Sequence, residues 1–255
     1  QRYLMKRFVE RFTATKPKLL NMLTEIDSLS SYSRTVFITP ESLNTLDFRI
    51  ITDSNDFVVK DMVTQISDAS TGLAMFFSKH CVVGVVPPFP LLEDLDCRKG
   101  FTEPLKQIFS RELTIGVLLL RLGKYSVGVI EKDELVKSKT GSRYVKRRHK
   151  AGGTSQRRFE RSRERWNREL FDATCRSVKD VFDPYDKQLN YVFMGGERNI
   201  LRNFMNRCEY LKKRENRITR RLLKMRRPSY TTLRSISPQI WESQVVAFDP
   251  STSQH

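Results

Sequence analysis

Histidine, cysteine and tryptophan are scarce in this sequence, and their scarcity excludes several kinds of protein. The 255 residues include three His, four Cys and two Trp. The cysteines lie far apart without C-x-x-C spacing, and the histidines do not cluster with them. We therefore expect no metal site, and buried thiols in a reducing compartment in place of a disulfide framework. The residues concerned are Cys81, Cys97, Cys175, Cys208, His80, His149 and His255.

Long apolar runs are also missing. A helix that spans a bilayer needs about 20 consecutive apolar residues, and this sequence has no such run. The first residues, QRYLMKRFVERF, are mixed and charged, unlike a signal peptide. We therefore expect a cytoplasmic protein with no membrane partner. The glycines match neither a Walker A loop nor a GxGxxG fingerprint, and we expect no cofactor.

Acidic residues are too few to balance the basic ones. The sequence has 46 Lys and Arg against 29 Asp and Glu, which gives a formal net charge of +17. Such an excess favours a polyanionic partner, because Lys and Arg displace counterions from phosphates. The hydrophobic content of 39% and the 16 phenylalanines are enough for a folded core.

The first half of the chain alternates helix and strand patterns. Apolar residues at helical spacing predict helices within residues 1–30, with Pro17 as a break between them. Residues 35–39 are a strand candidate, residues 56–67 a helix candidate and residues 101–111 a short helix. Two apolar runs, residues 71–78 and 81–86, predict a hairpin.

The second half contains the clearest elements. Residues 113–120 and 125–130 predict a hairpin of central strands, and residues 131–139 continue as a more polar strand before a turn at Thr140-Gly141. Residues 155–182 form an amphipathic helix about 40 Å long, which Asp183-Pro184 ends. A strand at 189–194, a helix from 199 and a second basic run at 211–227, expected to be a helix face, follow.

This order predicts an α/β fold: a mixed sheet with hairpin strands, a long basic helix and an N-terminal elaboration of helices and strands. We expect the elaboration to span residues 1–112 and to pack on the main domain. The main, catalytic domain should span residues 113–245, and residues 246–255 should form a flexible tail.

The segment Ala151–Gln156 joins the polar strand to the long helix. Two glycines followed by Thr154 and Ser155 usually mean a flexible connection and a helix cap. The surroundings favour a binding role, because residues 141–168 contain eleven Lys or Arg and only two Glu. A helix N-terminus adds a positive dipole end and unpaired N–H groups. The segment therefore predicts an anion-binding surface several phosphates long, with glycines that let the backbone approach RNA closely. Its basic residues are Lys146, Arg147, Arg148, His149, Lys150, Arg157, Arg158 and Arg161.

Gln156 is the uncharged polar side chain at this tip that is suited to touch a reacting group. An amide is no useful acid or base at neutral pH, but it can hold a water molecule and donate to a developing oxyanion. That chemistry suits an activated ester, for which positioning supplies most of the rate acceleration. It suits phosphodiester cleavage less well.

The segment RYVKRRHKAGGTSQRRFERSRERWNRELFDATCRSVKDVF resembles the middle domain, with its ribonuclease-H-like fold, of the eukaryotic and archaeal class-1 peptide chain release factors. There, too, a basic strand, a glycine-glycine-glutamine loop and a long arginine-rich helix follow one another. The resemblance covers roughly residues 113–245. Thr154 and Ser155 stand between the glycines and Gln156, and this departure is similar to the release-factor-like peptidyl-tRNA hydrolases of ribosome-associated quality control, which include the ankyrin-repeat and zinc-finger type.

The resemblance implies that Gln156 is the catalytic glutamine and that Gly152 and Gly153 are the loop glycines. No stop-codon-reading domain is found in the sequence, which favours rescue of stalled ribosomes over ordinary termination. The expected partners are large-subunit ribosomal RNA and peptidyl-tRNA, bound by a monomer.

Three hypotheses remain open. The first is hydrolysis of the peptidyl-tRNA ester in the peptidyl-transferase centre. The second is a tRNA acceptor-end nuclease of the same lineage, to which His149 would contribute. The third is a non-catalytic factor that binds ribosomal RNA through its basic surface.

Overall fold

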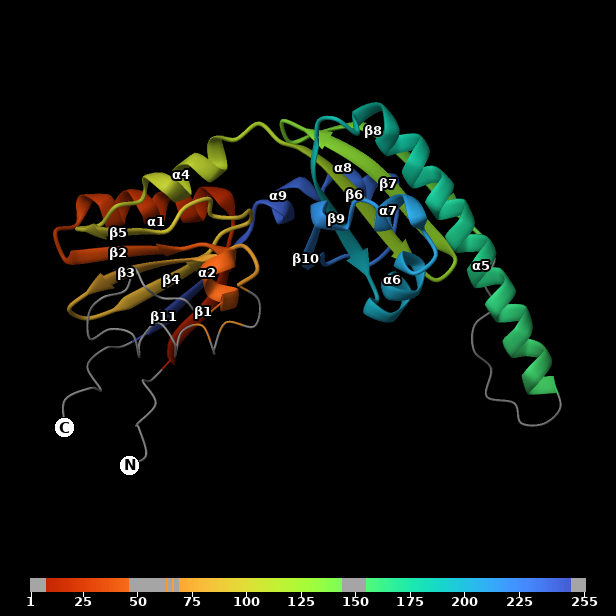
Figure 1. Cartoon of the computed structure of the whole chain (residues 1–255), viewed down its shortest axis with the longest axis horizontal. Coiled ribbons are helices and arrows are strands. Elements are labelled where there is room, and N and C mark those ends of the chain that lie inside the picture. Colours follow the sequence, from red (N-terminus) through yellow and green to blue (C-terminus); the bar gives the residue numbers. More distant parts are fainter. Residues whose placement is uncertain (1–7, 46–62, 64–65, 67–68, 144–154, 249–255) are drawn as a thin grey trace. The chain divides into compact units, whose positions relative to one another are not determined.

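The chain forms two compact units, each built around its own β-sheet, in a computed structural model (Figure 1). The structure describes residues 8–45, 63, 66, 69–143 and 155–248; for residues 8, 9, 155–160 and 163 it describes the backbone only. Unit 1 consists of the described residues up to Arg111 together with those from Trp241 onward. Unit 2 runs from Glu112 to Ile240.

Unit 1 contains an antiparallel sheet with the strand order β1-β11-β4-β3-β2-β5. Helices α1 and α4 lie along one side of it (Figure 1) and bury apolar residues such as Leu23 and Leu105. The strands are β1 (Phe8–Ala14), β2 (Tyr32–Ile38), β3 (Leu73–Ser78), β4 (Val82–Val86), β5 (Leu95–Arg98) and β11 (Ser243–Phe248). The helices are α1 (Lys16–Ser28), α2 (Pro40–Thr45) and α4 (Glu103–Ser110).

The helical prediction for residues 1–30 is right for α1 and wrong for Phe8–Ala14. That segment is β1, and its partner β11 lies more than 200 residues away in the sequence. Pro17 does not separate two helices; it lies in the first turn of α1, where a missing N–H costs nothing. The predicted hairpin is confirmed as β3 and β4, and the short helix as α4. The helix candidate at residues 56–67 lies almost entirely outside the described residues.

Unit 2 contains a mixed sheet with the strand order β10-β9-β6-β7-β8. β6, β7 and β8 pair antiparallel, as the predicted hairpin requires, whereas β9 lies parallel to both β6 and β10. The strands are β6 (Thr114–Arg121), β7 (Lys124–Glu131), β8 (Glu134–Ser142), β9 (Leu189–Gly196) and β10 (Ile218–Leu223). The helices are α5 (Ser155–Phe182), α6 (Arg198–Met205), α7 (Glu209–Lys212), α8 (Tyr230–Arg234) and α9 (Ser237–Ile240), with 3-10 turns η1 (Asp183–Tyr185) and η2 (Glu215–Arg217).

The core of unit 2 forms where α5 packs on β6 and β7. Their inner residues are fully or almost fully buried, as the apolar runs predict. Phe182, at the end of α5, lies against Gly116 of β6, where an added Cβ would come within 2.8 Å of the Phe182 ring. This close approach brings the end of the helix onto the sheet.

Two predictions in unit 2 are corrected by the structure. Thr140 and Gly141 do not form a turn, because β8 continues to Ser142. Gly141 is needed for another reason: the Tyr125 ring of β7 crosses it, and a Cβ there would overlap that ring. The basic run at 211–227 is not a helix face, because Ile218–Leu223 forms strand β10 at the edge of the sheet.

The predicted flexible tail from residue 246 also needs correction. Val246 and Phe248 are buried residues of β11, which pairs with both β1 and β4. The C-terminal segment therefore returns to unit 1, and this boundary differs from the expected end of the main domain at residue 245.

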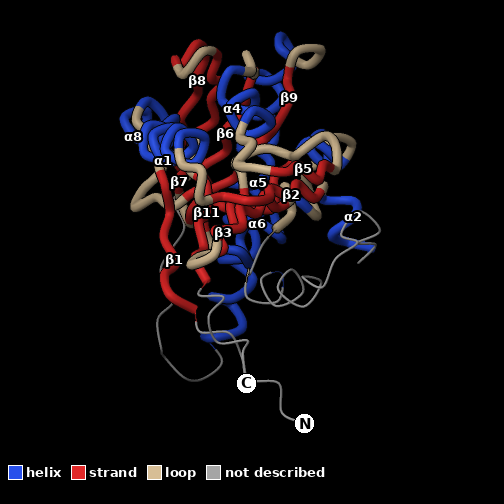
Figure 2. The backbone as a smooth tube through the Cα atoms, turned by 90° about the vertical axis from the view of Figure 1, so that its left-hand side faces the viewer, coloured by secondary structure: helices blue, strands red, loops and turns tan. Residues whose placement is uncertain are grey.

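Both units combine strands with helices (Figure 2), which confirms the predicted mixed α/β class. Unit 1 accounts for the elaboration of helices and strands expected before residue 113.

We predict that Gly141→Ala destabilises the protein by about 1–3 kcal/mol, because the new Cβ must displace the buried Tyr125 ring. The free energy of unfolding is measured by urea denaturation of wild type, Gly141→Ala, Tyr125→Ala and the double variant. In the Tyr125→Ala background, Gly141→Ala should cost little stability, so the losses of the two single variants should not add. Strictly additive losses would contradict the packing described here.

Candidate functional site

Helix α5 has two halves with different surroundings. From Leu170 to Phe182 its inner face is buried on the sheet, whereas the described side chains of residues 161–169 are exposed or only partly buried. Figure 1 shows the N-terminal half of α5 extending beyond the sheet of its own unit. Leu170 is the first fully buried residue of α5 among its described side chains, about 15 positions after Ser155 and roughly 22 Å along the helix. The helix therefore carries its first turn well away from the core.

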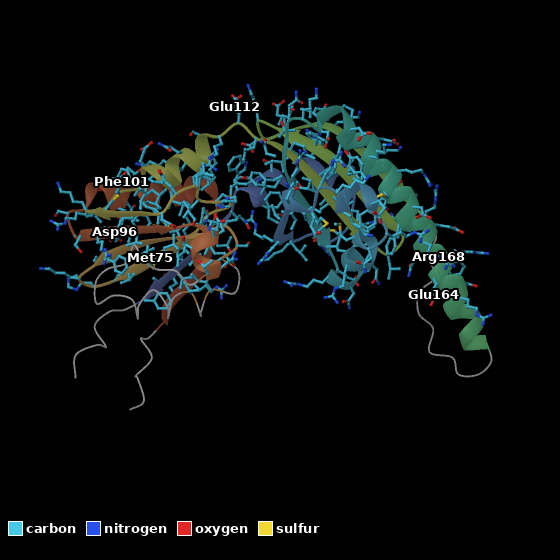
Figure 3. The ribbon with its side chains drawn as sticks, viewed as in Figure 1. Met75, Asp96, Phe101, Glu112, Glu164 and Arg168 are labelled. Carbon is cyan, nitrogen blue, oxygen red and sulfur yellow. A yellow bond between two sulfur atoms is a disulfide. The ribbon has the colours of Figure 1, made fainter. Side chains whose placement is uncertain are left out.

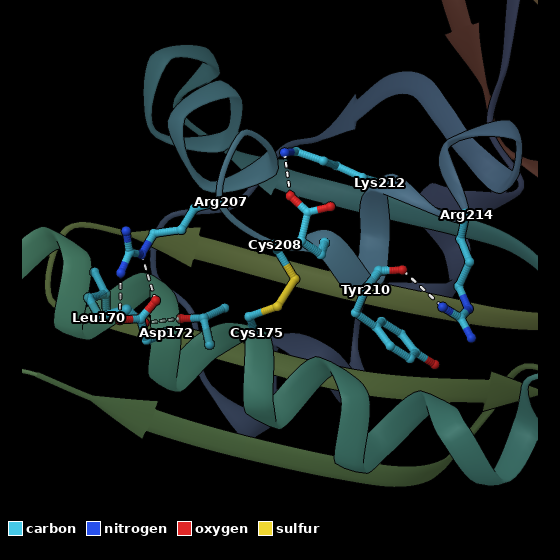
Figure 4. Close-up of a disulfide and its surroundings, with 10 residues drawn as sticks. Leu170, Asp172, Cys175, Arg207, Cys208, Tyr210, Lys212 and Arg214 are labelled. Carbon is cyan, nitrogen blue, oxygen red and sulfur yellow. Dashed lines mark hydrogen bonds and ion pairs between the residues drawn. A yellow bond between two sulfur atoms is a disulfide. The ribbon is translucent and has the colours of Figure 1, made fainter.

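The buried half of α5 is attached to the segment after α6 by two contacts that sequence reasoning missed (Figure 4). A disulfide joins Cys175 to Cys208, the residue that precedes α7. One turn earlier, Arg207 donates two hydrogen bonds to Asp172, at 2.6 and 2.9 Å. Together these contacts restrain α5 close to the point where it leaves the core.

Further contacts hold the same half of α5 to the sheet. Tyr125 of β7 and Ser177 share a buried hydrogen bond of 3.0 Å between their hydroxyls. Lys139 of β8 forms an exposed ion pair with Asp180 at 2.9 Å. All these anchors lie beyond Leu170, so none of them restrains the projecting half directly.

The expectation of four thiols is wrong. Cys175 and Cys208 are bonded, and Cys208 is fully buried. Cys81 and Cys97 are not disulfide-bonded, and both are partly exposed. The 33-residue separation of the bonded pair carries no sequence motif, so spacing alone could not identify it.

The structure locates only part of the predicted site. Ser155 and Gln156 are the first two residues of α5; the described backbone places Arg157 and Arg158 in the same first turn and Arg161 in the second. Arg161 is exposed. The remaining candidates, Lys146, Arg147, Arg148, His149, Lys150, Gly152, Gly153 and Thr154, lie outside the described residues.

The projecting half of α5 carries a surplus of positive charge. Arg161, Arg165 and Arg168 are exposed there (Figure 3 labels Arg168 and Glu164). Arg165 pairs with Glu169 at 3.7 Å. The first turn of α5 contains no acidic residue, so no carboxylate of that turn offsets the positive end of the helix dipole. This half of the helix suits contact with phosphate groups.

Three arginines of the second basic run have structural contacts within unit 2. Asp186 accepts hydrogen bonds from Arg214 at 2.6 Å and from Arg217 at 3.3 Å. Arg221 donates to the carbonyl of Ile240 and lies over the Phe193 ring. These arginines connect β10 and its flanks to the rest of unit 2, which leaves α5 as the stronger candidate for RNA contact.

Within the part of the chain that the structure describes, no group of three or more His, Cys, Asp or Glu could hold a metal ion. In the same residues, no helix is both long enough and apolar enough to cross a membrane.

Comparison with known proteins shows that the chain belongs to the class of translation release factors. The family model described as the Actinobacteria/chloroflexi VLRF1 release factor matches residues 113–246, and the chain belongs to this family. The resemblance read from residues 113–245 is thereby confirmed.

Single relatives and solved structures match over segments of different length. Peptide chain release factor subunit 1 of Methanosphaera stadtmanae is 32% identical over 108 residues, which are 42% of this chain. The chain spans about a quarter of that relative's length, 26%. The solved archaeal termination factor aRF1 is 15% identical, with a TM-score of 0.38 and coverage of 89% of this chain and 73% of its own. The Vms1 mitochondrial localization core is 14% identical, with a TM-score of 0.41 and coverage of 81% and 95%.

We predict that the Asp172–Arg207 pair makes stability depend on acid pH. The hydrogen bonds from Arg207 hold the pKa of Asp172 below its ordinary value in the folded protein. The pair therefore stabilises the fold above about pH 4, and this contribution is lost as the pH falls through the folded-state pKa. Asp172→Asn should flatten the fall in the free energy of unfolding below about pH 4, measured by urea denaturation at a series of pH values.

Arg207→Gln removes the main cause of the lowered Asp172 pKa and serves as the partner control. In that background, Asp172→Asn should change the acid limb much less, because only the weaker influence of Arg176 and Arg168 on the Asp172 pKa remains. An unchanged slope in the Asp172→Asn single variant would show that the pair contributes nothing to folding.

Proposed function

We propose that this chain is a peptidyl-tRNA hydrolase that releases nascent chains from stalled large ribosomal subunits in the cytoplasm. Membership of a release factor family supports action on the ribosome. The observation that carries the proposal is the placement of Gln156 in the first turn of a long basic helix whose far half is anchored in the core. Such a helix can carry one uncharged amide deep into a narrow RNA cavity.

In this proposal the loop that contains Gly152 and Gly153 enters the peptidyl-transferase centre. Gln156 holds a water molecule against the ester carbonyl carbon and donates to the oxyanion that develops there. The water oxygen bonds to that carbon, the bond from the carbon to the tRNA ribose oxygen breaks, and that oxygen takes the proton that the water gives up. The products are a peptide with a free carboxyl group and an intact tRNA. No cofactor or metal is needed.

The basic residues around the loop hold the RNA backbone in this proposal. Release-type chemistry depends on positioning, and phosphate contacts fix the orientation of a protein on its nucleic acid. The partners are ribosomal RNA of the large subunit and peptidyl-tRNA, and the protein acts as a monomer. The residues concerned are Lys146, Arg147, Arg148, His149, Lys150, Arg157, Arg158 and Arg161.

We predict that Gln156→Ala lowers the rate of peptide release by about 100-fold or more, because one positioned donor to an oxyanion is worth that much. The assay incubates purified stalled large subunits that carry labelled peptidyl-tRNA and follows free peptide over time. Affinity for the subunits, measured by co-sedimentation, should remain at the wild-type level.

Gln188→Ala is the matched control, because Gln188 is an exposed glutamine elsewhere in unit 2. It should release peptide as wild type does. Undiminished release by Gln156→Ala would remove the proposed catalytic role. Binding by wild type without any release would instead support a non-catalytic factor.

We predict that the double change Arg157→Glu and Arg158→Glu weakens binding and reduces its salt dependence. Each lost phosphate contact makes the negative slope of log K against log salt shallower by roughly 0.7 to 0.9. Binding to large subunits is measured between about 50 and 200 mM salt, the range over which such contacts have large effects.

The control carries the same charge reversal on unit 1, at Lys79 and Arg98, both exposed and remote in sequence from α5. It should change the slope little. Equal slopes for wild type and the Arg157/Arg158 variant would argue against phosphate contacts at the start of α5.

A further inference from the structure

Unit 2 contains a pocket of about 250 Å³ between α5, α6 and the turn that follows β6. Leu170, Phe171 and Ile200 supply apolar surface, and the amides of Asn167, Asn199 and Asn203 supply the polar groups. Ligand pockets commonly measure about 300–1,000 Å³, so this one suits a single small ring system.

The spacing of these residues follows the two helices. Asn167, Leu170 and Phe171 stand at positions i, i+3 and i+4 of α5, and Asn199 and Asn203 stand four apart on α6. Phe171 is held in place by a T-shaped contact with Phe204, with ring centroids 5.9 Å apart. The walls are therefore two facing helices, and the Cys175–Cys208 disulfide and the Asp172–Arg207 pair tie α5 to the segment that follows α6.

Asn167 carries the main evidence for a ligand. Its Oδ1 is buried and has no hydrogen-bond partner among the described residues. A buried acceptor left unpaired costs about 1–3 kcal/mol, so buried polar atoms are almost always paired. A ligand group in the pocket that donates to this oxygen would remove the cost.

The chemistry of the lining selects among ligands. Three amides with apolar carbon between them fit a flat, neutral group that has both donors and acceptors on its edge. Glu197 also lines the pocket and pairs with Arg121 at 3.7 Å, and the described residues that line it include no Lys or Arg that would hold a phosphate inside. Exposed arginines stand beside the amides in sequence, Arg168 on α5 and Arg198 and Arg202 on α6. They suit phosphates that remain outside.

We propose that this pocket holds an unstacked RNA base, an inference that rests on the proposed binding of RNA. Proteins read RNA sequence mostly in single-stranded segments, whose bases stack on aromatic side chains and bond through their edges. Asparagine pairs with the adenine edge in particular, because its amide donates and accepts side by side. The pocket therefore prefers adenine.

The base in this pocket is distinct from the nucleotide that carries the ester. Asn167 lies 11 positions after Gln156 on one helix, which is about 16 Å along its axis. The pocket captures a nucleotide at that distance and fixes how far α5 advances along the RNA. The bound base thereby fixes the position of α5 along the RNA, which phosphate contacts alone do not do.

The test compares two fluorescein-labelled RNA hexamers, r(A)6 and a hexamer of the same length with abasic sites, by fluorescence anisotropy. Wild type should bind r(A)6 more tightly. The double change Asn199→Leu and Asn203→Leu should weaken r(A)6 binding about tenfold and change binding of the abasic hexamer less than twofold. Asn216→Leu, the same replacement at an exposed site in η2, should change neither.

Asn167→Leu guards against misfolding as an explanation. This near-isosteric change removes the unpaired oxygen, so thermal unfolding should show an equal or higher midpoint. Binding of r(A)6 should nevertheless weaken. Improved stability with unchanged r(A)6 affinity would overturn the proposal.

Three further outcomes would overturn it. The first is equal affinity of wild type for both hexamers. The second is an equal loss of affinity for both hexamers in the asparagine variants. The third is a loss of ribosome binding in those variants with unchanged hexamer binding, which would mean that the pocket contacts a protein. If wild type releases no peptide but still binds r(A)6 more tightly than the abasic hexamer, the hydrolase proposal is rejected and the base-binding proposal is retained.

Discussion

The packing of one half of α5 on the sheet of unit 2 is the constraint on which the rest of the account depends. Leu170, Val178 and Phe182 are fully buried there, and burial of such side chains stabilises a fold by roughly 1.5–3 kcal/mol each. Because this burial ends at Leu170, the same helix continues into solvent as a basic projection. A single continuous helix thus joins the hydrophobic core to the candidate site.

The contacts around the base of α5 explain why the projection can act as a rigid support. The disulfide and the Asp172–Arg207 pair hold the helix from the segment after α6, and the Tyr125–Ser177 hydrogen bond holds it from β7. A helix fixed at one end moves at its tip by an amount that grows with its length, so small displacements at the base matter for positioning. Reactive groups must be held within fractions of an ångström for efficient catalysis.

Local signals in the sequence predicted the site-bearing element well. The bounds of α5, the β6–β7 hairpin and the β3–β4 hairpin follow from periodicity, short turns and the stop at Asp183-Pro184. The errors concern long-range partners. β1 and β11 form strands because they pair with each other across most of the chain, and β10 is a strand because β9 offers it a parallel edge. The disulfide likewise depends on α5 and α7 meeting in space.

The central claim is that water, positioned at Gln156, attacks the ester of peptidyl-tRNA. Mass spectrometry of the peptide released from stalled large subunits in water enriched with heavy oxygen tests it directly. The account predicts a free peptide whose terminal carboxyl group carries one heavy oxygen, together with intact tRNA. Released peptide that still bears nucleotides of the tRNA acceptor end would contradict the claim and establish RNA cleavage in its place.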